Sequence, residues 1–134
     1  MGHATAGYDA ALTYAKRRKQ FGKPLVSYQL VQDRLVGMLA QVTAMQLYCR
    51  RLADLSLAGR LEPTLAGLAK AHNTSTARTV LAEARDLLGG NGILLDFHVI
   101  RHMADIESIH TYEGTETIQR LIVGRDITGV TAFG

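Results

Sequence analysis

Hydrophobic residues recur at three- and four-residue intervals along most of the chain, in segments separated by short stretches rich in glycine and polar residues. This spacing places apolar side chains on one face of a helix. No stretch shows the strict alternation of apolar and polar residues that a half-buried strand requires. The pattern therefore predicts an all-α protein, an up-and-down four-helix bundle with a short extra helix.

The first two helices are expected on either side of a basic loop. An alanine-rich helix over residues 4–16 ends before Pro24, and a loop of about ten residues lies between the helices. The second helix extends almost to Gly59 and would be roughly 40 Å long at about 1.5 Å per residue. Its apolar positions alternate in steps of four and three, which is typical of a helix packed along its length against near-parallel neighbours. These positions are Val31, Leu35, Met38, Val42, Met45, Cys49 and Leu52.

Proline and glycine delimit a third helix, expected over residues 64–88. Pro63 stands where the helix would begin, and the Gly-Gly-Asn-Gly sequence at residues 89–92 offers glycines for a left-handed cap and a tight turn. The middle of this helix, residues 72–77, is small and polar on several faces. This part is therefore either poorly buried or packed closely against another backbone.

Two shorter helices are expected in the last third of the chain. An amphipathic stretch over residues 97–106 is separated from the last helix by a gap over residues 108–114. The last helix starts at Thr115, a favourable N-cap residue, and places Glu116 at the positive end of the helix dipole. It ends before Gly129.

Length and composition indicate one folded domain, residues 1–134. Hydrophobic residues make up 47% of the chain and charged residues 20%, which excludes a disordered or low-complexity protein. The net charge is +3, and the only dense basic cluster covers residues 16–19 with Lys23 close behind. A local anion site fits this cluster better than a nucleic-acid interface, which normally needs a continuous basic stripe.

The sequence carries no signal for export or membrane insertion. Its one cysteine, Cys49, cannot form an internal disulfide, and the first residues lack the charged and apolar regions of a signal peptide. No apolar run approaches the ~18 residues of a membrane span. We therefore expect a cytoplasmic location.

Two histidines, His98 and His102, are spaced four residues apart on one helix face. No third ligand is indicated, and the residues between them lack the glutamate of a His-Glu-x-x-His motif. We expect solvated or hydrogen-bonded histidines and no metal site. Cys49, Met38 and Met45 are expected to be core residues.

Three other stretches could carry chemistry. Glu113, between Tyr112 and Gly114, is either a base in a partly apolar pocket or a surface carboxylate near a helix N-terminus. Residues 18–22 combine a guanidinium with an aromatic ring and a glycine, which suits a phosphate and a planar ring. The glycines of residues 89–92 either let a ligand approach the backbone or end a helix.

Taken together, these stretches resemble the C-terminal domain of the acyl-CoA dehydrogenases. The order and spacing of the motifs match over about a hundred residues, which is nearly the whole chain. The motifs are RKQFGKPL at residues 18–25 with Gln29, LLGGNGI at 87–93, HVIRH at 98–102, and YEGT at 112–115 with LIVGR at 121–125. The ending ITGVTAF at residues 127–133 looks most like the glutaryl-CoA dehydrogenase branch.

The resemblance implies an FAD enzyme that removes an α proton and a β hydride from an acyl-CoA thioester. It makes Glu113 the base, assigns Tyr112 and Gly114 to the substrate, and gives the Glu113 backbone N–H a part in polarising the thioester carbonyl. In the glutaryl branch the oxidised product would also lose its terminal carboxylate as CO2. Two groups of residues are implied to contact FAD. An FAD bound mainly by another subunit would be contacted by Arg18, Phe21, Gln29, Asp86, Leu87, Leu88, Gly89 and Gly90. Thr115 would contact the FAD of its own subunit, and Phe133 would lie near it.

The chain departs from the family pattern at two positions. Asp86 and Thr117 stand where many family members have glutamine, which makes those two contacts less secure. Family members also have an N-terminal helical domain and a middle β domain that this chain lacks. We therefore expect a fragment that neither retains FAD nor turns over substrate by itself.

The resemblance further implies partners. The parent enzyme would pass electrons to an electron-transfer flavoprotein and would form a homo-oligomer, a dimer or a tetramer. The alternative function is a non-catalytic helical oligomerisation module, in which the apolar seam of residues 31–52 and the small residues 73–77 pack between chains. A phosphate or nucleic-acid binder fits less well, because the chain has no basic face outside the loop.

Overall fold

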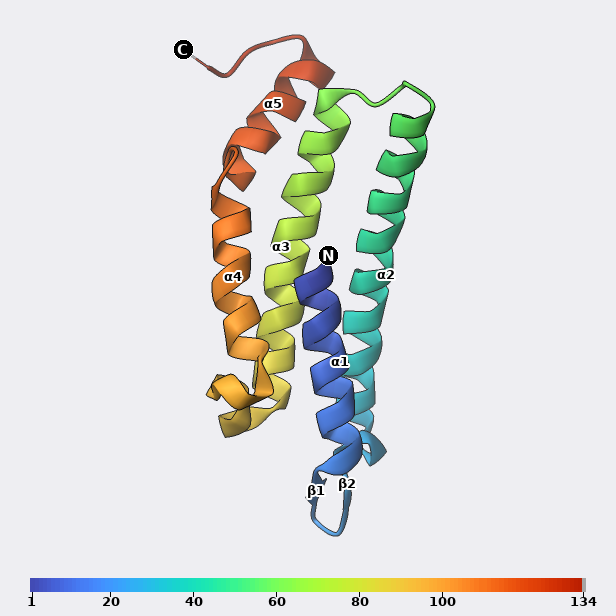
Figure 1. Ribbon diagram of the computed structural model, residues 1–134, viewed down its shortest axis with the longest axis vertical. Helices are drawn as coiled ribbons and strands as arrows, with labels where there is room; N and C mark the ends of the chain where they lie inside the picture. Colours follow the sequence, from blue (N-terminus) through green and yellow to red (C-terminus); the bar gives the residue numbers. More distant parts are fainter. Residues whose placement is uncertain (134) are drawn as a thin grey trace.

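The computed structural model describes residues 1–133, which form an up-and-down bundle of helices (Figure 1). The helices are α1 (Gly2–Arg17), α2 (Gln29–Leu57), α3 (Pro63–Leu87), α4 (Val99–Thr111) and α5 (Glu116–Thr128). The first three alternate in direction, and α4 and α5 follow one another along α3 as a fourth column (Figure 1). The predicted all-α bundle is confirmed. None of the helices within residues 1–133 is long and apolar enough to cross a membrane.

The connections contain short elements that the sequence pattern did not predict. Between α1 and α2, strands β1 (Lys19–Gln20) and β2 (Lys23–Pro24) form an antiparallel hairpin, and a 3-10 turn (Leu25–Ser27) follows. Two further 3-10 turns, η2 (Gly89–Ile93) and η3 (Leu95–Phe97), join α3 to α4. Strands of two residues are too short to show an alternating pattern, so the hairpin was expected as a plain loop.

Helix α4 also differs from its predicted bounds. It begins at Val99 and continues to Thr111, through residues that were expected to lie in a gap. The physical reason is that Ile106, which is buried, is followed three residues later by Ile109, which packs against the same core. This spacing extends the apolar face of the helix by one turn.

Helix α3 lies at the centre of the bundle and contacts each of the other four helices. Its buried side chains are mostly small: Gly67, Ala69, Ala71, Thr74, Ala77 and Ala84, beside Val80, Leu81 and Leu87. The approach to α1 is so close that a Cβ at Gly7 would lie 2.7 Å from the Cδ2 atom of Leu81. Residues 72–77 were expected to be either poorly buried or closely packed. Thr74 and Ala77 are buried, which confirms close packing for these two residues.

The apolar seam of α2 faces the core, as predicted. Leu35, Met38, Val42 and Met45 are buried along it. Cys49 is only half-buried, because α1 has 16 residues and covers about half of the 29-residue α2 (Figure 1). The part of the seam from Leu35 to Met45 therefore packs inside the chain, whereas Leu52 at its end lines an open groove.

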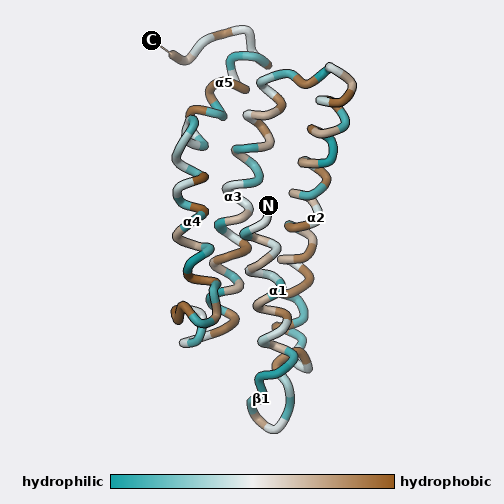
Figure 2. Tube along the Cα trace, in the orientation of Figure 1, coloured by the Kyte–Doolittle hydropathy of each residue, from teal (hydrophilic) through white to brown (hydrophobic). Residues whose placement is uncertain are grey.

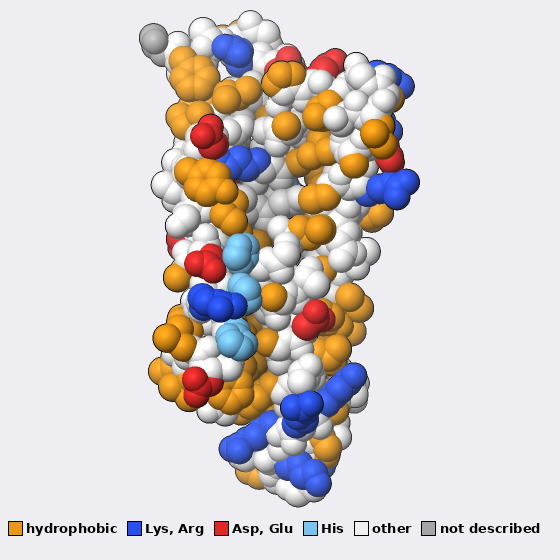
Figure 3. All heavy atoms as spheres, in the orientation of Figure 1, with side chains coloured by type: hydrophobic (Ala, Val, Ile, Leu, Met, Phe, Trp, Pro, Cys, Tyr) orange, Lys and Arg blue, Asp and Glu red, His pale blue; other side chains and the backbone are white. Residues whose placement is uncertain are grey.

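Beyond the N-terminal end of α1, a groove of about 530 Å³ lies open between α2 and α3. Its lining is mostly apolar, with Tyr48, Leu52, Leu55, Leu61, Leu65 and Leu68, and it also includes the charged residues Arg51, Arg60 and Glu62. Hydrophobic segments of both helices reach this end of the bundle (Figure 2), and apolar side chains are exposed over it (Figure 3). The short first helix thus leaves apolar surface uncovered.

The turn after α3 depends on a glycine that lies against backbone. A Cβ at Gly92 would lie 2.1 Å from the carbonyl oxygen of Arg85, whereas a Cβ at Gly90 would meet no atom within 4 Å. We expect Gly92→Ala to lower the free energy of unfolding by about 1–3 kcal/mol, because the turn must move away from α3. Urea unfolding followed by circular dichroism measures this.

Gly90→Ala is the matched control and should change stability by less than about 0.5 kcal/mol. Equal losses in the two variants would show that close packing at Gly92 is not what the turn requires.

Candidate functional site

The turn between α4 and α5 presents Glu113 at the surface. Glu113 and Gly114 both adopt left-handed backbone conformations, with φ of 53° and 85°. The side chains of Tyr112 and Glu113 are exposed. Thr115 caps α5, since its hydroxyl accepts a hydrogen bond from the Ile118 N–H at 3.4 Å, and the predicted N-cap is confirmed.

All three carbonyl groups of this turn are held by side chains. The Lys70 ammonium, from α3, donates to the Tyr112 carbonyl and to the Gly114 carbonyl, the latter at 2.6 Å. The Gln119 amide, from α5, donates to the Glu113 carbonyl at 2.9 Å. The backbone of Glu113 is therefore fixed from both sides while its carboxylate stays accessible.

The sequence analysis missed Lys70 and Gln119. Lys70 is 42 residues from Tyr112 and contacts it only because α3 and α5 pack together, so no local pattern could have revealed it. Gln119 lies on the first turns of α5 and could have been suspected from its distance of six residues to Glu113.

The backbone conformation favours glycine at position 114, and the Gln119 side chain lies close beside it. Its φ of 85° strains any residue with a side chain, and a Cβ there would lie 2.7 Å from the Gln119 Nε2 atom. A Cβ at Gly67 of α3 would lie 2.7 Å from the Gln119 Oε1 atom. The room beside Gly114, expected for a substrate, is thus taken by Gln119 in this structure.

Glu113 does not lie in an apolar pocket formed by this chain. Its side chain is exposed, and its neighbour Tyr112 is 54% exposed. The residues 1–133 therefore supply the position of the carboxylate, and they do not supply an apolar enclosure around it.

At the opposite end of the bundle, two stretches predicted to contact a cofactor come together. Arg18, at the end of α1, and residues 86–90, at the end of α3, line one open hollow of about 390 Å³. The side chains of Leu87 and Leu88 are buried in the core, so only their backbone can face a ligand. Gln29 is exposed at the first position of α2 and is not among the residues that line this hollow.

The hairpin next to this hollow exposes an aromatic ring. Phe21 is 93% exposed at the tip, with φ of 52°, and Gly22 follows with φ of 82°. Positive φ at both central residues is typical of a tight two-residue hairpin turn. Tyr28 supports the hairpin, because its hydroxyl donates to the Gln20 carbonyl at 2.8 Å and Lys23 lies over its ring. The turn type therefore accounts for the left-handed conformation of Phe21, and its ring is left accessible at the tip.

The charge at this end is positive in spite of Asp86. The Asp86 carboxylate forms ion pairs with Arg34 at 2.7 Å and Arg85 at 3.1 Å. Its hydrogen bond with Arg34, together with the charge of that arginine, lowers the pKa of Asp86 below its ordinary value. Basic side chains gather around the hairpin (Figure 3), so an anionic group would be attracted there.

The predicted cofactor residues fall into two separate groups. Arg18, Phe21 and residues 86–90 lie at the hairpin end, whereas Thr115 lies next to Glu113 near the other end. Phe133 follows α5, in the tail near the end of the bundle opposite the hairpin (Figure 1). Lys70, which holds the Glu113 turn, is 16 residues before Asp86 on α3 and hence about 24 Å away along that helix.

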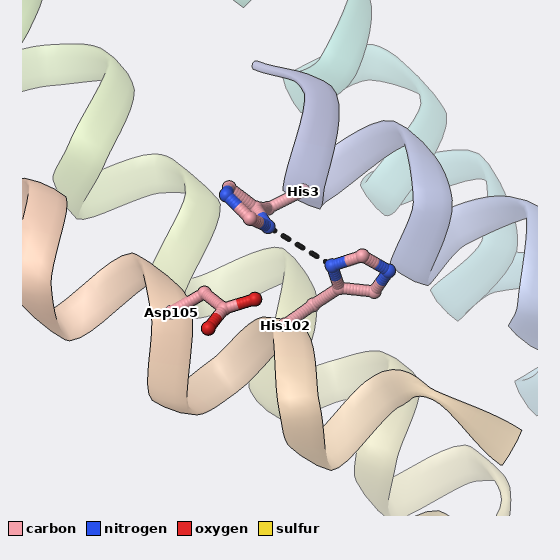
Figure 4. Close-up of side chains that lie close together, drawn as sticks. All are labelled: His3, His102 and Asp105. Carbon is pink, nitrogen blue, oxygen red and sulfur yellow. Dashed lines mark hydrogen bonds between the residues drawn. The ribbon is translucent and has the colours of Figure 1, made fainter. Parts of the chain in front are cut away.

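His98 and His102, expected to be solvated or hydrogen-bonded histidines, have different surroundings. His98 is exposed at the N-cap of α4 with φ of 63°, and His102 instead approaches His3 of α1, with 2.9 Å between their Nδ1 atoms (Figure 4). Burial lowers the pKa of His102, and the charges of His3 and Arg101 lower it further.

Comparison with known proteins gives a family. Residues 1–128 match the family described as "Acyl-CoA dehydrogenase, C-terminal domain". The chain belongs to this family. The acyl-CoA dehydrogenase domain is 38% identical to a probable acyl-CoA dehydrogenase of Mycobacterium tuberculosis, over 93% of this chain and 32% of that protein. It is 30% identical to a 3-(aryl)acrylate reductase of Clostridium sporogenes, over 95% of this chain and 34% of that protein.

Solved structures agree with this assignment. A glutaryl-CoA dehydrogenase from Mycobacterium smegmatis superposes with a TM-score of 0.96 at 37% identity, over 99% of this chain and 34% of that one. The butyryl-CoA dehydrogenase of Megasphaera elsdenii gives a TM-score of 0.90 at 32% identity, over 94% and 33%. The acyl-CoA dehydrogenase domain thus spans about a third of the length of these relatives.

The ion pair of Asp86 with Arg34 should make the stability of the domain depend on pH. Because the pKa of Asp86 is lowered on folding, its contribution is fully present above its ordinary pKa of 3.8 and is lost as the pH falls through the lower folded-state value. We expect Asp86→Asn to lower the urea midpoint at pH 7 and to have progressively less effect below pH 3.8.

The exposed Asp33 provides the control, since Asp33→Asn should change the midpoint little at any pH. An Asp86→Asn effect that is the same at pH 7 and at acidic pH would contradict the ion-pair explanation.

Proposed function

We propose that this chain is the C-terminal third of an FAD-dependent acyl-CoA dehydrogenase in which Glu113 abstracts the α proton of the thioester. The observation that carries the proposal is the turn itself. Within a domain of this family, Lys70 and Gln119 fix three successive carbonyls, and the carboxylate between them remains accessible. A base fixed in this way can meet a substrate proton without first reorganising.

The backbone of the same residue fits a second role. Among residues 1–133, no backbone carbonyl accepts a hydrogen bond from the Glu113 N–H. This donor is therefore available for the thioester carbonyl, where negative charge develops as the α proton leaves. The Glu113 carboxylate takes the proton, and bound FAD supplies the acceptor for the β hydride.

The hairpin end fits part of the cofactor. The positive charge of Arg18 and its neighbours suits a diphosphate, and the exposed ring of Phe21 suits packing on a planar group. The backbone of residues 86–90 would line the same ligand. Because this end is about 24 Å from the Glu113 turn along α3, we propose that each cofactor is shared between two copies, with Thr115 and Phe133 contacting the one next to their own Glu113.

The substrate proposed for the parent enzyme is an acyl-CoA of the glutaryl type, with loss of CO2 after oxidation. Support comes from the superposition with two glutaryl-CoA dehydrogenase structures from Mycobacterium smegmatis, at 37% and 34% identity, the second of which is in complex with FADH2. An electron-transfer flavoprotein is the proposed electron acceptor, and the cytoplasm the proposed location. The bundle alone supplies neither an enclosed pocket at Glu113 nor the flavin-ring contacts, so the isolated chain is proposed to be inactive.

The second candidate function is assembly. The open groove between α2 and α3 exposes leucines, and on the outer face of α2 Leu47 is 65% exposed. Exposed apolar side chains gathered on one face are typical of a surface that packs against another chain, here a second copy of this one.

A chimaera tests the catalytic proposal. The chain would replace the matching third of the Mycobacterium smegmatis glutaryl-CoA dehydrogenase. We expect the chimaera to bind flavin stoichiometrically and to oxidise glutaryl-CoA in a dye-coupled assay. Glu113→Gln should lower the rate by about 10²–10⁴-fold or more without loss of flavin, because the base is removed. Flavin absorbance and dye reduction measure the two effects.

The exposed Glu62, near the start of α3, gives the control, and Glu62→Gln should leave the rate unchanged. A Glu113→Gln chimaera with full activity would rule out this base. The chain by itself should show neither a flavin spectrum nor dye reduction. Activity of the chain alone would contradict the proposal that it is a fragment.

Light scattering tests the assembly proposal. We expect a mass above the 14.6 kDa of one chain, and a monomer for Leu47→Glu, because a charge on this face disfavours packing between copies. The neighbouring Gln46 is exposed, and Gln46→Glu introduces the same charge one residue away as a control. A clean 14.6 kDa species for the unmodified chain would contradict assembly through this domain.

A further inference from the structure

Three potential metal ligands meet between α1 and α4, away from the Glu113 turn. His3 comes from the first turn of α1, and His102 and Asp105 lie one helical turn apart on α4. The two imidazoles and the carboxylate converge on one space between the helices (Figure 4). Their ligand atoms all lie within 4.8 Å of one another.

The spacing of these atoms suits a small divalent ion. The two Nδ1 atoms are 2.9 Å apart. Two imidazole nitrogens bound to one tetrahedral Zn²⁺ at about 2.0–2.1 Å lie about 3.3 Å from each other, so the rings need to separate by only a few tenths of an ångström. The present hydrogen bond requires one ring to carry its proton on Nδ1, and that proton must move to Nε2 before both nitrogens can bind an ion.

The chemistry of the donors narrows the choice of ion. Two imidazole nitrogens and one carboxylate oxygen suit Zn²⁺ and similar transition-metal ions, whereas Mg²⁺ and Ca²⁺ prefer oxygen ligands alone. Three protein ligands leave the remaining coordination position to water. The carboxylate also offsets the positive charge of the neighbouring Arg101.

The scaffold under the three ligands is rigid. Ala4, the residue after His3, and Val99 on α4 are fully buried, and Ile106 on α4 is buried. These residues belong to the core that joins α1 to α4. His3 and His102 are half-buried and Asp105 is exposed, so an ion can reach the site from solvent. Little conformational freedom is lost when the ligands bind, because helix packing already brings them together.

We propose that His3, His102 and Asp105 form a binding site for one divalent transition-metal ion, which links α1 to α4. The site is independent of the proposed flavin chemistry. Because the bound ion contacts both helices, it would stabilise the folded chain over the unfolded one. The sequence predicted no metal site, because no third ligand was indicated beside His98 and His102. The fold supplies His3, 99 residues from His102.

The test uses the purified chain without added histidine residues, stripped with a chelator and titrated with Zn²⁺ against a chromophoric competitor. We expect one equivalent to bind and to raise the thermal unfolding midpoint. Loss of even an outer-shell partner costs metal sites about 10–100-fold in affinity, so His3→Gln and His102→Gln should each weaken binding at least tenfold. Asp105→Asn removes the charged ligand and should likewise weaken binding about tenfold or more.

His98→Gln is the matched control, because His98 is an exposed histidine on the same segment outside the cluster. It should leave the Zn²⁺ affinity unchanged. Absence of saturable binding below about 1 mM Zn²⁺, or equal weakening by His98→Gln and His102→Gln, would overturn the proposal. Circular dichroism of each variant shows whether it is folded, and Asp105→Asn changes only an exposed side chain, so the comparison does not depend on the two half-buried histidines.

Discussion

The close packing of α3 against four other helices is the constraint on which this structure depends. One helix can contact four neighbours only if its side chains are small on several faces. Gly67, Thr74 and Ala77 meet this requirement in three different turns of α3. The same small residues admit functional groups, since Gly67 leaves the space that the Gln119 amide occupies. Helix packing and the geometry of the Glu113 turn thus both require small residues on α3.

The Glu113 turn shows how a rigid scaffold supports a left-handed backbone. The positive φ of Glu113 would be unfavourable in an isolated peptide, whereas Gly114 adopts a positive φ readily. Here the three carbonyl groups of the turn are bound by Lys70 from one helix and Gln119 from another. These hydrogen bonds offset the conformational cost, and they also replace the water that the carbonyls would otherwise bind. The carbonyl groups of the turn are bound, whereas the Glu113 carboxylate stays accessible to a substrate.

Local periodicity was enough to predict the helices, but not the contacts between them. The seam from Leu35 to Met45 predicted the buried face of α2, and the Thr115 cap predicted the start of α5. The hairpin was missed because two-residue strands carry no pattern. The contacts of Lys70 with the Glu113 turn, and of His3 with His102, join residues far apart in sequence, and only packing determines them.

The two ends of α3 carry different halves of the proposed catalytic unit, with Glu113 near one end and Arg18 at the other. If each unit is built from two copies, a substitution in one half of the unit leaves the other half of the same copy intact. A copy without Glu113 still offers an intact hairpin end, and a copy without Arg18 still offers an intact base. A mixture of the two would then contain some complete units, although neither copy forms one alone. In a cell with two damaged alleles, this geometry would appear as partial complementation within a single gene.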